Sequence, residues 1–200
     1  SFSPSEKLSI AKLLLEDLKA DRIEVASARV SEGEYEGVKK ITEWAKKNNL
    51  LNKIEVLAFI DNNESVDWIN NAGAKVVNLL SKGSLKHVQE QLKKTPEQHI
   101  QDIKHVIQYA TGKGLQVNIY LEDWSNGMRN SQDYVFQLID ALKNDKIKRF
   151  MLPDTLGILN PNETESFCKI MLEKYPGLQF DFHAHNDYDL AVANTFAAVH

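Results

Sequence analysis

The sequence has few of the residues and runs that mark a special class of protein. It contains one cysteine, Cys168, in 200 residues, so no disulfide can form within the chain. Cys168 falls in a helical pattern and is predicted to lie in a core. No apolar run approaches the roughly 18 residues of a membrane span, and the start does not resemble a signal peptide. These absences predict a cytoplasmic protein that does not act at a membrane.

Basic residues are neither abundant nor clustered. The chain has 24 lysines and arginines against 28 aspartates and glutamates, and its net charge is -4. Proteins that bind nucleic acids or anionic membranes usually carry a basic patch, so neither partner is expected. A content of 42% hydrophobic and 26% charged residues is ordinary for a globular protein. The length predicts a single domain over residues 1–200.

Short β-rich runs alternate with amphipathic helical patterns along the chain. The predicted strands are 22–27, 54–61, 76–80, 116–122, 149–152 and 179–183. The predicted helices are about 4–18, 33–48, 63–72, 84–94, 96–112, 131–144, 161–175 and from 190 onward. Alternation of strand and helix without hairpin signals predicts βαβ units and a parallel sheet.

Two parallel architectures have this order of elements. A doubly wound sheet that binds a dinucleotide needs a glycine-rich first turn, but the first strand here continues as Ala-Ser-Ala-Arg at 26–29. The strand faces favour a barrel instead, because the run 116–122 alternates strictly between polar and apolar residues. Its polar row is Asn118, Tyr120 and Glu122.

In a barrel, the apolar rows face the helices and the polar rows face the lumen near its mouth. A complete (β/α)8 barrel takes about 250 residues. Six strands in 200 residues therefore predict an incomplete TIM barrel of the α/β class, whose first and last strands are not in the sequence.

His183 and His185 form the most informative motif. Side chains at i and i+2 of an extended segment project from one face, so both imidazoles can converge on one point. Two ligands of one metal ion require this arrangement, and neutral imidazoles suit zinc, manganese or a mixed-ligand magnesium site. The spacing alone leaves open a partly buried, hydrogen-bonded pair of histidines.

Several segments resemble one family. Residues 183–194 (His-Ala-His-Asn-Asp-Tyr-Asp-Leu-Ala-Val-Ala-Asn) closely resemble the histidine signature of the DRE-TIM metallolyases. That family includes 2-isopropylmalate, homocitrate and citramalate synthases and the hydroxymethylglutaryl-CoA lyases. Residues 152–157 are similar to its sixth-strand signature, 121–123 to the Ser-x-Glu-Asp tip of the synthases' fifth strand, and 72–74 to its third repeat.

The resemblance implies an acyltransferase that condenses acetyl-CoA with a 2-oxo acid and uses a divalent metal ion (Mg, Mn or Zn). It implies a cytoplasmic homodimer in amino-acid biosynthesis, such as leucine biosynthesis. His183 and His185 match the metal ligands, Glu122 matches the catalytic acid–base position, and Thr155 matches the threonine that binds the oxo acid carboxylate. The alternatives are C–C cleavage of the hydroxymethylglutaryl-CoA lyase type and a non-catalytic barrel fragment.

The sequence departs from the family pattern in two places. It contains no Arg-Asp-Gly/Glu segment, which supplies an arginine and a metal-ligating acid in the family. Asp189 stands where most members carry glycine, which indicates a less common subgroup and leaves the identity of the oxo acid open. Of the other polar residues, Asp123 is predicted to cap a helix or face solvent. Surface positions are predicted for His87, His99 and His105.

Overall fold

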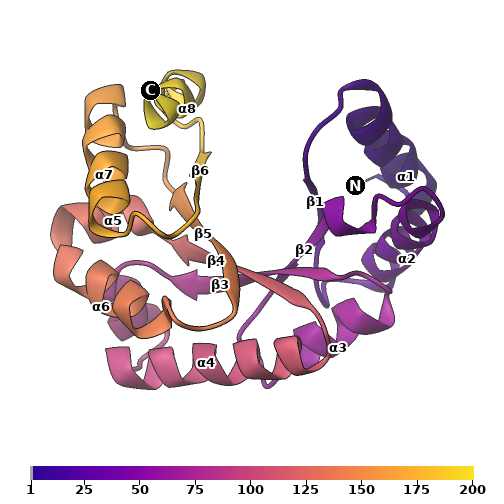
Figure 1. Ribbon diagram of the computed structural model, residues 1–200, viewed down its shortest axis with the longest axis horizontal. Coiled ribbons are helices and arrows are strands. Elements are labelled where there is room, and N and C mark those ends of the chain that lie inside the picture. The colour runs from indigo at the N-terminus through magenta and orange to yellow at the C-terminus, as the bar shows by residue number, and fades with distance from the viewer. Residues whose placement is uncertain (1) are drawn as a thin grey trace. The chain divides into compact units, whose positions relative to one another are not determined.

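The computed structural model describes residues 2–200 and shows an α/β fold with six strands in one sheet (Figure 1). The strand order follows the chain, β1 to β6, and the ladders β1–β2, β2–β3 and β5–β6 are parallel. Parallel strands in chain order, separated by helices, are typical of a TIM barrel, so the prediction of an incomplete barrel is confirmed. The strands are β1 (Ile23–Ser27), β2 (Ile54–Ala58), β3 (Val76–Lys82), β4 (Gln116–Glu122), β5 (Ile147–Asp154) and β6 (Phe180–Ala184).

Helices stand at all the predicted places, and the described residues contain two further ones, the short η2 and α5. The segment after β4 forms α5 (Trp124–Asn130), between the predicted strand 116–122 and the predicted helix 131–144. The helices are α1 (Pro4–Lys12), η1 (Leu13–Asp17), α2 (Glu32–Lys47), η2 (Leu51–Lys53), α3 (Glu64–Asn71), η3 (His87–Gln91), α4 (Pro96–Gly112), α5, α6 (Gln132–Leu142), α7 (Pro161–Lys174) and α8 (Ala191–Val199). Within residues 2–200, none of them has the length and apolar character needed to cross a membrane.

Helix starts with a proline at the first position are held by reciprocal capping bonds. The side chain of Ser3 accepts a bond from the Glu6 N–H, and the Glu6 carboxylate accepts one from the Ser3 N–H. The same box is present at Asn160 before α7. Each box satisfies two backbone donors that a helix N-terminus leaves unpaired, which is why these helices begin where they do.

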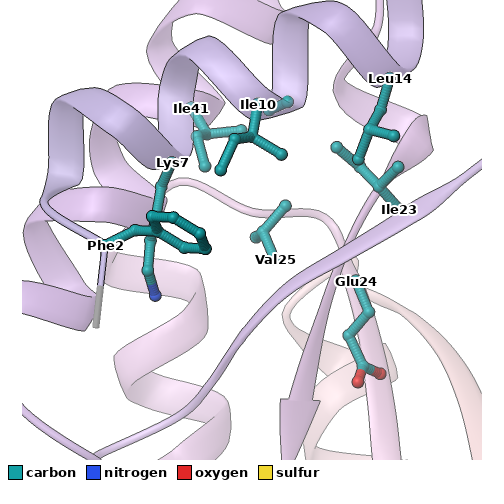
Figure 2. A pocket seen from close by; sticks show the side chains of 9 residues that line it. Phe2, Lys7, Ile10, Leu14, Ile23, Glu24, Val25 and Ile41 are labelled. Carbon is teal, nitrogen blue, oxygen red and sulfur yellow. The ribbon is translucent and has the colours of Figure 1, made fainter. Parts of the chain in front are cut away.

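The chain divides into two compact units. The first comprises the chain up to Leu79 together with His105–Val117, and the second comprises Leu80–Lys104 and Asn118–His200. In the first unit, β1 shows the expected alternation of faces. Figure 2 shows Ile23 and Val25 directed toward the helices and Glu24 directed the opposite way. On the helix side lies a cavity of about 270 Å³, also lined by Phe2, Lys7, Ile10, Ala11, Leu14 and Ile41.

The core of the second unit is centred on aromatic residues. Trp124, the first residue of α5, is fully buried. The rings of Phe167 and Phe182 meet it edge-on at centroid distances of 6.1 and 6.4 Å, a favourable geometry for aromatic pairs. Cys168 is buried as predicted, and burial raises the pKa of its thiol to about 11. A thiol held in this protonated form is an inert core residue.

Two glycines allow the ends of β3 and β4 to meet closely. A Cβ atom on Gly83 would lie 2.5 Å from the carbonyl oxygen of Leu121. A Cβ atom on Gly127 would lie 2.1 Å from the carbonyl oxygen of Gly83. Both contacts are with backbone, which cannot rotate away as a flexible side chain could. Any larger residue at either position must therefore move the chain.

We expect Gly83→Ala to lower the free energy of unfolding by about 3 kcal/mol, the upper part of the range for overpacking. Gly112→Ala is the matched control, because no atom lies within 4 Å of its added Cβ. It should be neutral or stabilising by up to ~1 kcal/mol, since alanine is the better helix former. Urea unfolding of both variants measures the difference. Equal midpoints would contradict the close approach at Gly83.

Candidate functional site

The four predicted site residues lie in the second unit at the carboxyl ends of their strands. Glu122 is the last residue of β4, and Thr155 directly follows β5. His183 is the penultimate residue of β6, and His185 is the first residue beyond it. The carboxyl ends of parallel barrel strands are where active sites are built. The positions therefore agree with a catalytic or binding role.

The two histidines are neighbours, as their spacing indicates. The centroids of their rings are 5.1 Å apart, and the ring planes are inclined by 31°. The hydroxyl of Tyr120, on β4, lies 3.4 Å from Nδ1 of His183. The His185 N–H donates to the carbonyl oxygen of Asp154 at 3.3 Å, which ties the segment after β6 to the end of β5. Because Nδ1 of His183 faces Tyr120, Nε2 is the nitrogen available for a metal.

The electrostatics of the pair favour a neutral imidazole at His183. His183 keeps access to solvent, but its neighbours remove part of its ring from water. This loss of hydration, with the proximity of His185, lowers the pKa of His183. A neutral imidazole is the form that ligates a metal. The donor chemistry thus fits a divalent cation, with two nitrogen ligands. Residues 2–200 contain no group of three or more His, Cys, Asp or Glu side chains placed to hold a metal.

Glu122 is paired with a residue that the sequence did not indicate. Nζ of Lys82, the last residue of β3, forms an ion pair with the Glu122 carboxylate. The two side chains are only 16% and 24% exposed. The sequence predicts that this strand ends at residue 80, so the prediction leaves Lys82 out of the polar row that it continues. Continuing the alternation from Asn78 through Leu80 would have found it.

The backbone of Lys82 is fixed on both sides. Its N–H donates to Nε2 of His99 at 3.1 Å, and its carbonyl oxygen accepts a bond from the Tyr134 hydroxyl at 3.0 Å. His99 is 1% exposed, so the prediction of a surface position is wrong. Burial, and next the charge of Lys94, lower the pKa of His99 to about 4. A neutral ring can accept the Lys82 N–H, whereas a charged ring could not.

Thr155 is oriented by the turn after β4. The Asp123 N–H donates to Oγ1 of Thr155 at 2.8 Å. Asp123 stands at the N-terminus of α5, but its side chain makes no helix-capping bond and is 2% exposed. The prediction that it caps a helix or faces solvent is therefore wrong. Asp154 orients its own loop, because its carboxylate accepts the N–H groups of Ile158 and Leu159.

The remaining predicted surface histidines differ from each other. His105, on α4, is exposed as expected. His87 is half-buried, and its Nε2 lies 3.4 Å from the Asp123 carboxylate. Its surface assignment is therefore wrong, because a partner on another element covers it.

The backbone of the loop between β6 and α8 explains why aspartate can replace glycine at position 189. Asp189 has a φ of 57°, in the left-handed region that favours glycine. Most members of the resembled family carry glycine here, and aspartate is among the few other residues that tolerate this conformation. The side chain of Asn186 donates to the Asp189 carboxylate and accepts the Ala191 N–H, which begins α8. Aspartate at this position is thus compatible with the left-handed backbone that the loop adopts here.

The first unit holds a separate pair of carboxylates. The side-chain amide of Asn78 donates to Glu24 at 2.6 Å and to Glu55 at 2.9 Å. Burial raises the pKa of Glu24, the bond from Asn78 opposes this, and the charge of Glu55 adds to the rise. Glu24 thus points away from Ile23 and Val25, at the edge of the cavity that all three residues line (Figure 2).

The chain is similar to proteins of one family over its whole length. A model of the HMGL-like family matches residues 1–200. Homocitrate synthase of Saccharolobus islandicus strain L.S.2.15 is 31% identical over 99% of this chain. The homocitrate synthase of Sulfurisphaera tokodaii is 29% identical over the same share. In both comparisons the chain spans 42% of the relative's length.

Solved structures agree on the fold. The HMG-CoA lyase of Bacillus subtilis aligns with a TM-score of 0.72 at 19% identity, over 99% of this chain and 67% of that one. The carboxyl transferase domain of Rhizobium etli pyruvate carboxylase aligns with a TM-score of 0.71 at 15% identity, over 99% and 34%. At such low identity these likenesses show the fold alone.

The buried His99 predicts a specific pH dependence of stability. Its folded pKa of about 4 lies below the ordinary 6.5, so between these values the unfolded chain binds the extra proton. The free energy of unfolding should therefore fall by about 3 kcal/mol through this group as pH drops from 6.5 to 4. Urea unfolding across this window should show a shallower dependence for His99→Gln. His105→Gln, at an exposed site, should keep the wild-type slope, and equal slopes in all three proteins would refute the assignment.

Proposed function

Because the chain belongs to the HMGL-like family, the DRE-TIM metallolyases, we propose that it carries acid–base and metal-binding residues of an enzyme that condenses acetyl-CoA with a 2-oxo acid. The similarity to homocitrate synthases at about 30% identity supports a condensing enzyme. The observation that carries the proposal is the row at the carboxyl ends of β3, β4 and β6. It joins the pair Lys82–Glu122 to the His183–His185 pair through Tyr120 on the same strand as Glu122.

His183 and His185 would hold the divalent cation, which would supply Lewis-acid polarisation of the oxo acid's keto group. Tyr120 holds the His183 ring in place through its hydroxyl. Such a partner on the second nitrogen fixes the orientation of a ligating ring. The chain's part in metal binding is thus to supply two nitrogen ligands, of which that of His183 is oriented by Tyr120.

Condensation requires that a proton leave the methyl carbon of acetyl-CoA before that carbon attacks the keto carbon. The keto oxygen then takes up a proton, and water cleaves the thioester to release the CoA thiol. Glu122 is the acid–base group for proton transfer, since its carboxylate ends the polar row of β4. Lys82 holds that carboxylate in place. Thr155 binds the oxo acid carboxylate through its hydroxyl hydrogen, because its oxygen already accepts the Asp123 N–H.

Cleavage of a 3-hydroxyacyl-CoA is the alternative on the same residues. The two reactions are separated by direct assay of the intact protein. Condensation releases the CoA thiol from acetyl-CoA only when a suitable 2-oxo acid is present. Cleavage produces acetyl-CoA from a hydroxyacyl thioester alone. A panel of 2-oxo acids with short alkyl, branched alkyl and carboxyalkyl chains identifies the acceptor, and absence of both activities would leave a non-catalytic domain.

Replacing both histidines tests the metal assignment. We expect the double variant His183→Ala, His185→Ala to lose its bound divalent cation, because the two nitrogen ligands disappear together. Metal analysis of the dialysed protein measures the stoichiometry. His105→Ala is the control, since this histidine is exposed on α4 and lies in the other unit. Unchanged metal content in the double variant would sink the assignment.

Glu122→Gln tests the acid–base role, because it keeps the shape of the side chain and removes its charge. We expect kcat to fall by roughly 10²-fold or more, the scale of general acid–base contributions. KM for the oxo acid should change much less, since Thr155 and the cation site provide that binding. Glu165→Gln, at an exposed glutamate on α7, should retain wild-type kinetics. A normal kcat with a large rise in KM would instead assign Glu122 to ground-state binding.

A further inference from the structure

Asp123 has a left-handed backbone and is buried. Its φ is 65°, in the left-handed region that is unfavourable for most residues with a side chain. It is also 1% exposed. Such strained, buried positions persist only where surrounding contacts hold them, and they cluster at functional sites. Asp123 directly follows Glu122, so its backbone conformation determines how the chain leaves the end of β4.

The contacts of the Asp123 carboxylate come from two segments. Ser84, after β3, donates its hydroxyl to Oδ2 at 2.6 Å, and Nε2 of His87 lies 3.4 Å from the same oxygen. Asn126, on α5, donates its side-chain amide to Oδ1 at 2.8 Å. A buried carboxylate needs such donors to offset the loss of water. The carboxylate therefore links the chain after β3 to the chain after β4.

The backbone around Asp123 extends this link to β5. Its N–H donates to Oγ1 of Thr155 at 2.8 Å, and the carbonyl oxygen of Glu122 accepts the Gly83 N–H at 2.6 Å. Both groups belong to the single planar peptide unit between Glu122 and Asp123, which directly precedes the left-handed residue, so this one unit bonds to both Gly83 and Thr155. Glu122 and Thr155 thus share one support, although they stand on different strands.

We infer that Asp123 is a positioning residue, whose buried carboxylate holds the turn that orients Glu122 and Thr155 for the reaction. The inference rests on the proposed function for its kinetic consequences but not for its structural ones. Misplacement of a catalytic group by about 1 Å can cost on the order of 10²-fold in rate. Removing the support should therefore reduce turnover even though Asp123 touches no substrate.

The variant that isolates the carboxylate is Asp123→Gly, because glycine adopts the left-handed conformation without strain. Asp189→Gly is the matched control, an exposed aspartate with nearly the same φ in the same unit. In the intact protein we expect kcat to fall by roughly 10- to 100-fold in Asp123→Gly. Metal content should stay unchanged, and Asp189→Gly should be near wild type. Asp123→Asn, which keeps the shape and one acceptor oxygen, should recover part of the loss.

A double variant tests whether Asp123 acts through Thr155. If it does, the losses in kcat/KM from Asp123→Gly and Thr155→Val should combine to less than their product, because the second change removes what the first has already misplaced. Fully multiplicative losses would overturn that route. A normal kcat in Asp123→Gly with reduced overall stability would show a merely structural role and overturn the inference.

Amide hydrogen exchange supplies a readout that needs no substrate. Loss of the support should speed exchange in peptides that contain Gly83 and residue 123, while the β6 peptide stays as in the wild type. If the wild type condenses no 2-oxo acid, the proposed function fails, and amide hydrogen exchange then tests the positioning role of Asp123 by itself. Faster exchange at both places then supports the positioning role. Unchanged exchange in Asp123→Gly and Asp123→Asn would overturn it.

Discussion

The alternation of side chains along parallel strands is the constraint on which this structure depends. Successive residues point to opposite faces, so one strand delivers an apolar row to the helices and a polar row to the other side. On β4, Ile119 and Leu121 are fully buried, while Tyr120 and Glu122 keep some exposure. The same rule directs Glu24 of β1 opposite to Ile23 and Val25 (Figure 2). Alternate residues of one strand thus provide the packing against the helices and the polar groups on the opposite face.

This constraint explains why the sequence predicted most of the fold. A period of two, broken by amphipathic helices, located all six strands and their parallel order. The strand ends were less certain, because polar residues that continue the alternation look like the start of a loop. For this reason the predicted strand 76–80 omits Lys82, which is the last residue of β3. Helix α5 was missed because Trp124, Asn126 and Gly127 read as a turn, and only the surrounding core shows that Trp124 is buried.

The site was predictable where its members are close in sequence and less so where they are not. The spacing of His183 and His185 indicates their common face without further information. The pairing of Lys82 with Glu122 depends on strand order and register. The ring of His99 accepts a bond from the backbone N–H of Lys82, which lies 17 residues away in the sequence. No local pattern marks Asp123 as left-handed, because the conformation comes from partners on other segments. Such contacts are tertiary, and the sequence alone does not specify them.

The charges of the polar row show how it can serve a reaction. Within the second unit, the acid Glu122 is matched by Lys82, and Asp181 is matched by Arg149 at 2.8 Å. Paired charges cost less to remove from water than single ones, so the row can be held partly buried before any ligand binds. His183 differs, since its neighbours are a phenol and another imidazole, and its lowered pKa keeps it neutral. A cation bound at the histidines would thus bring a positive charge that these two nitrogen ligands do not neutralise.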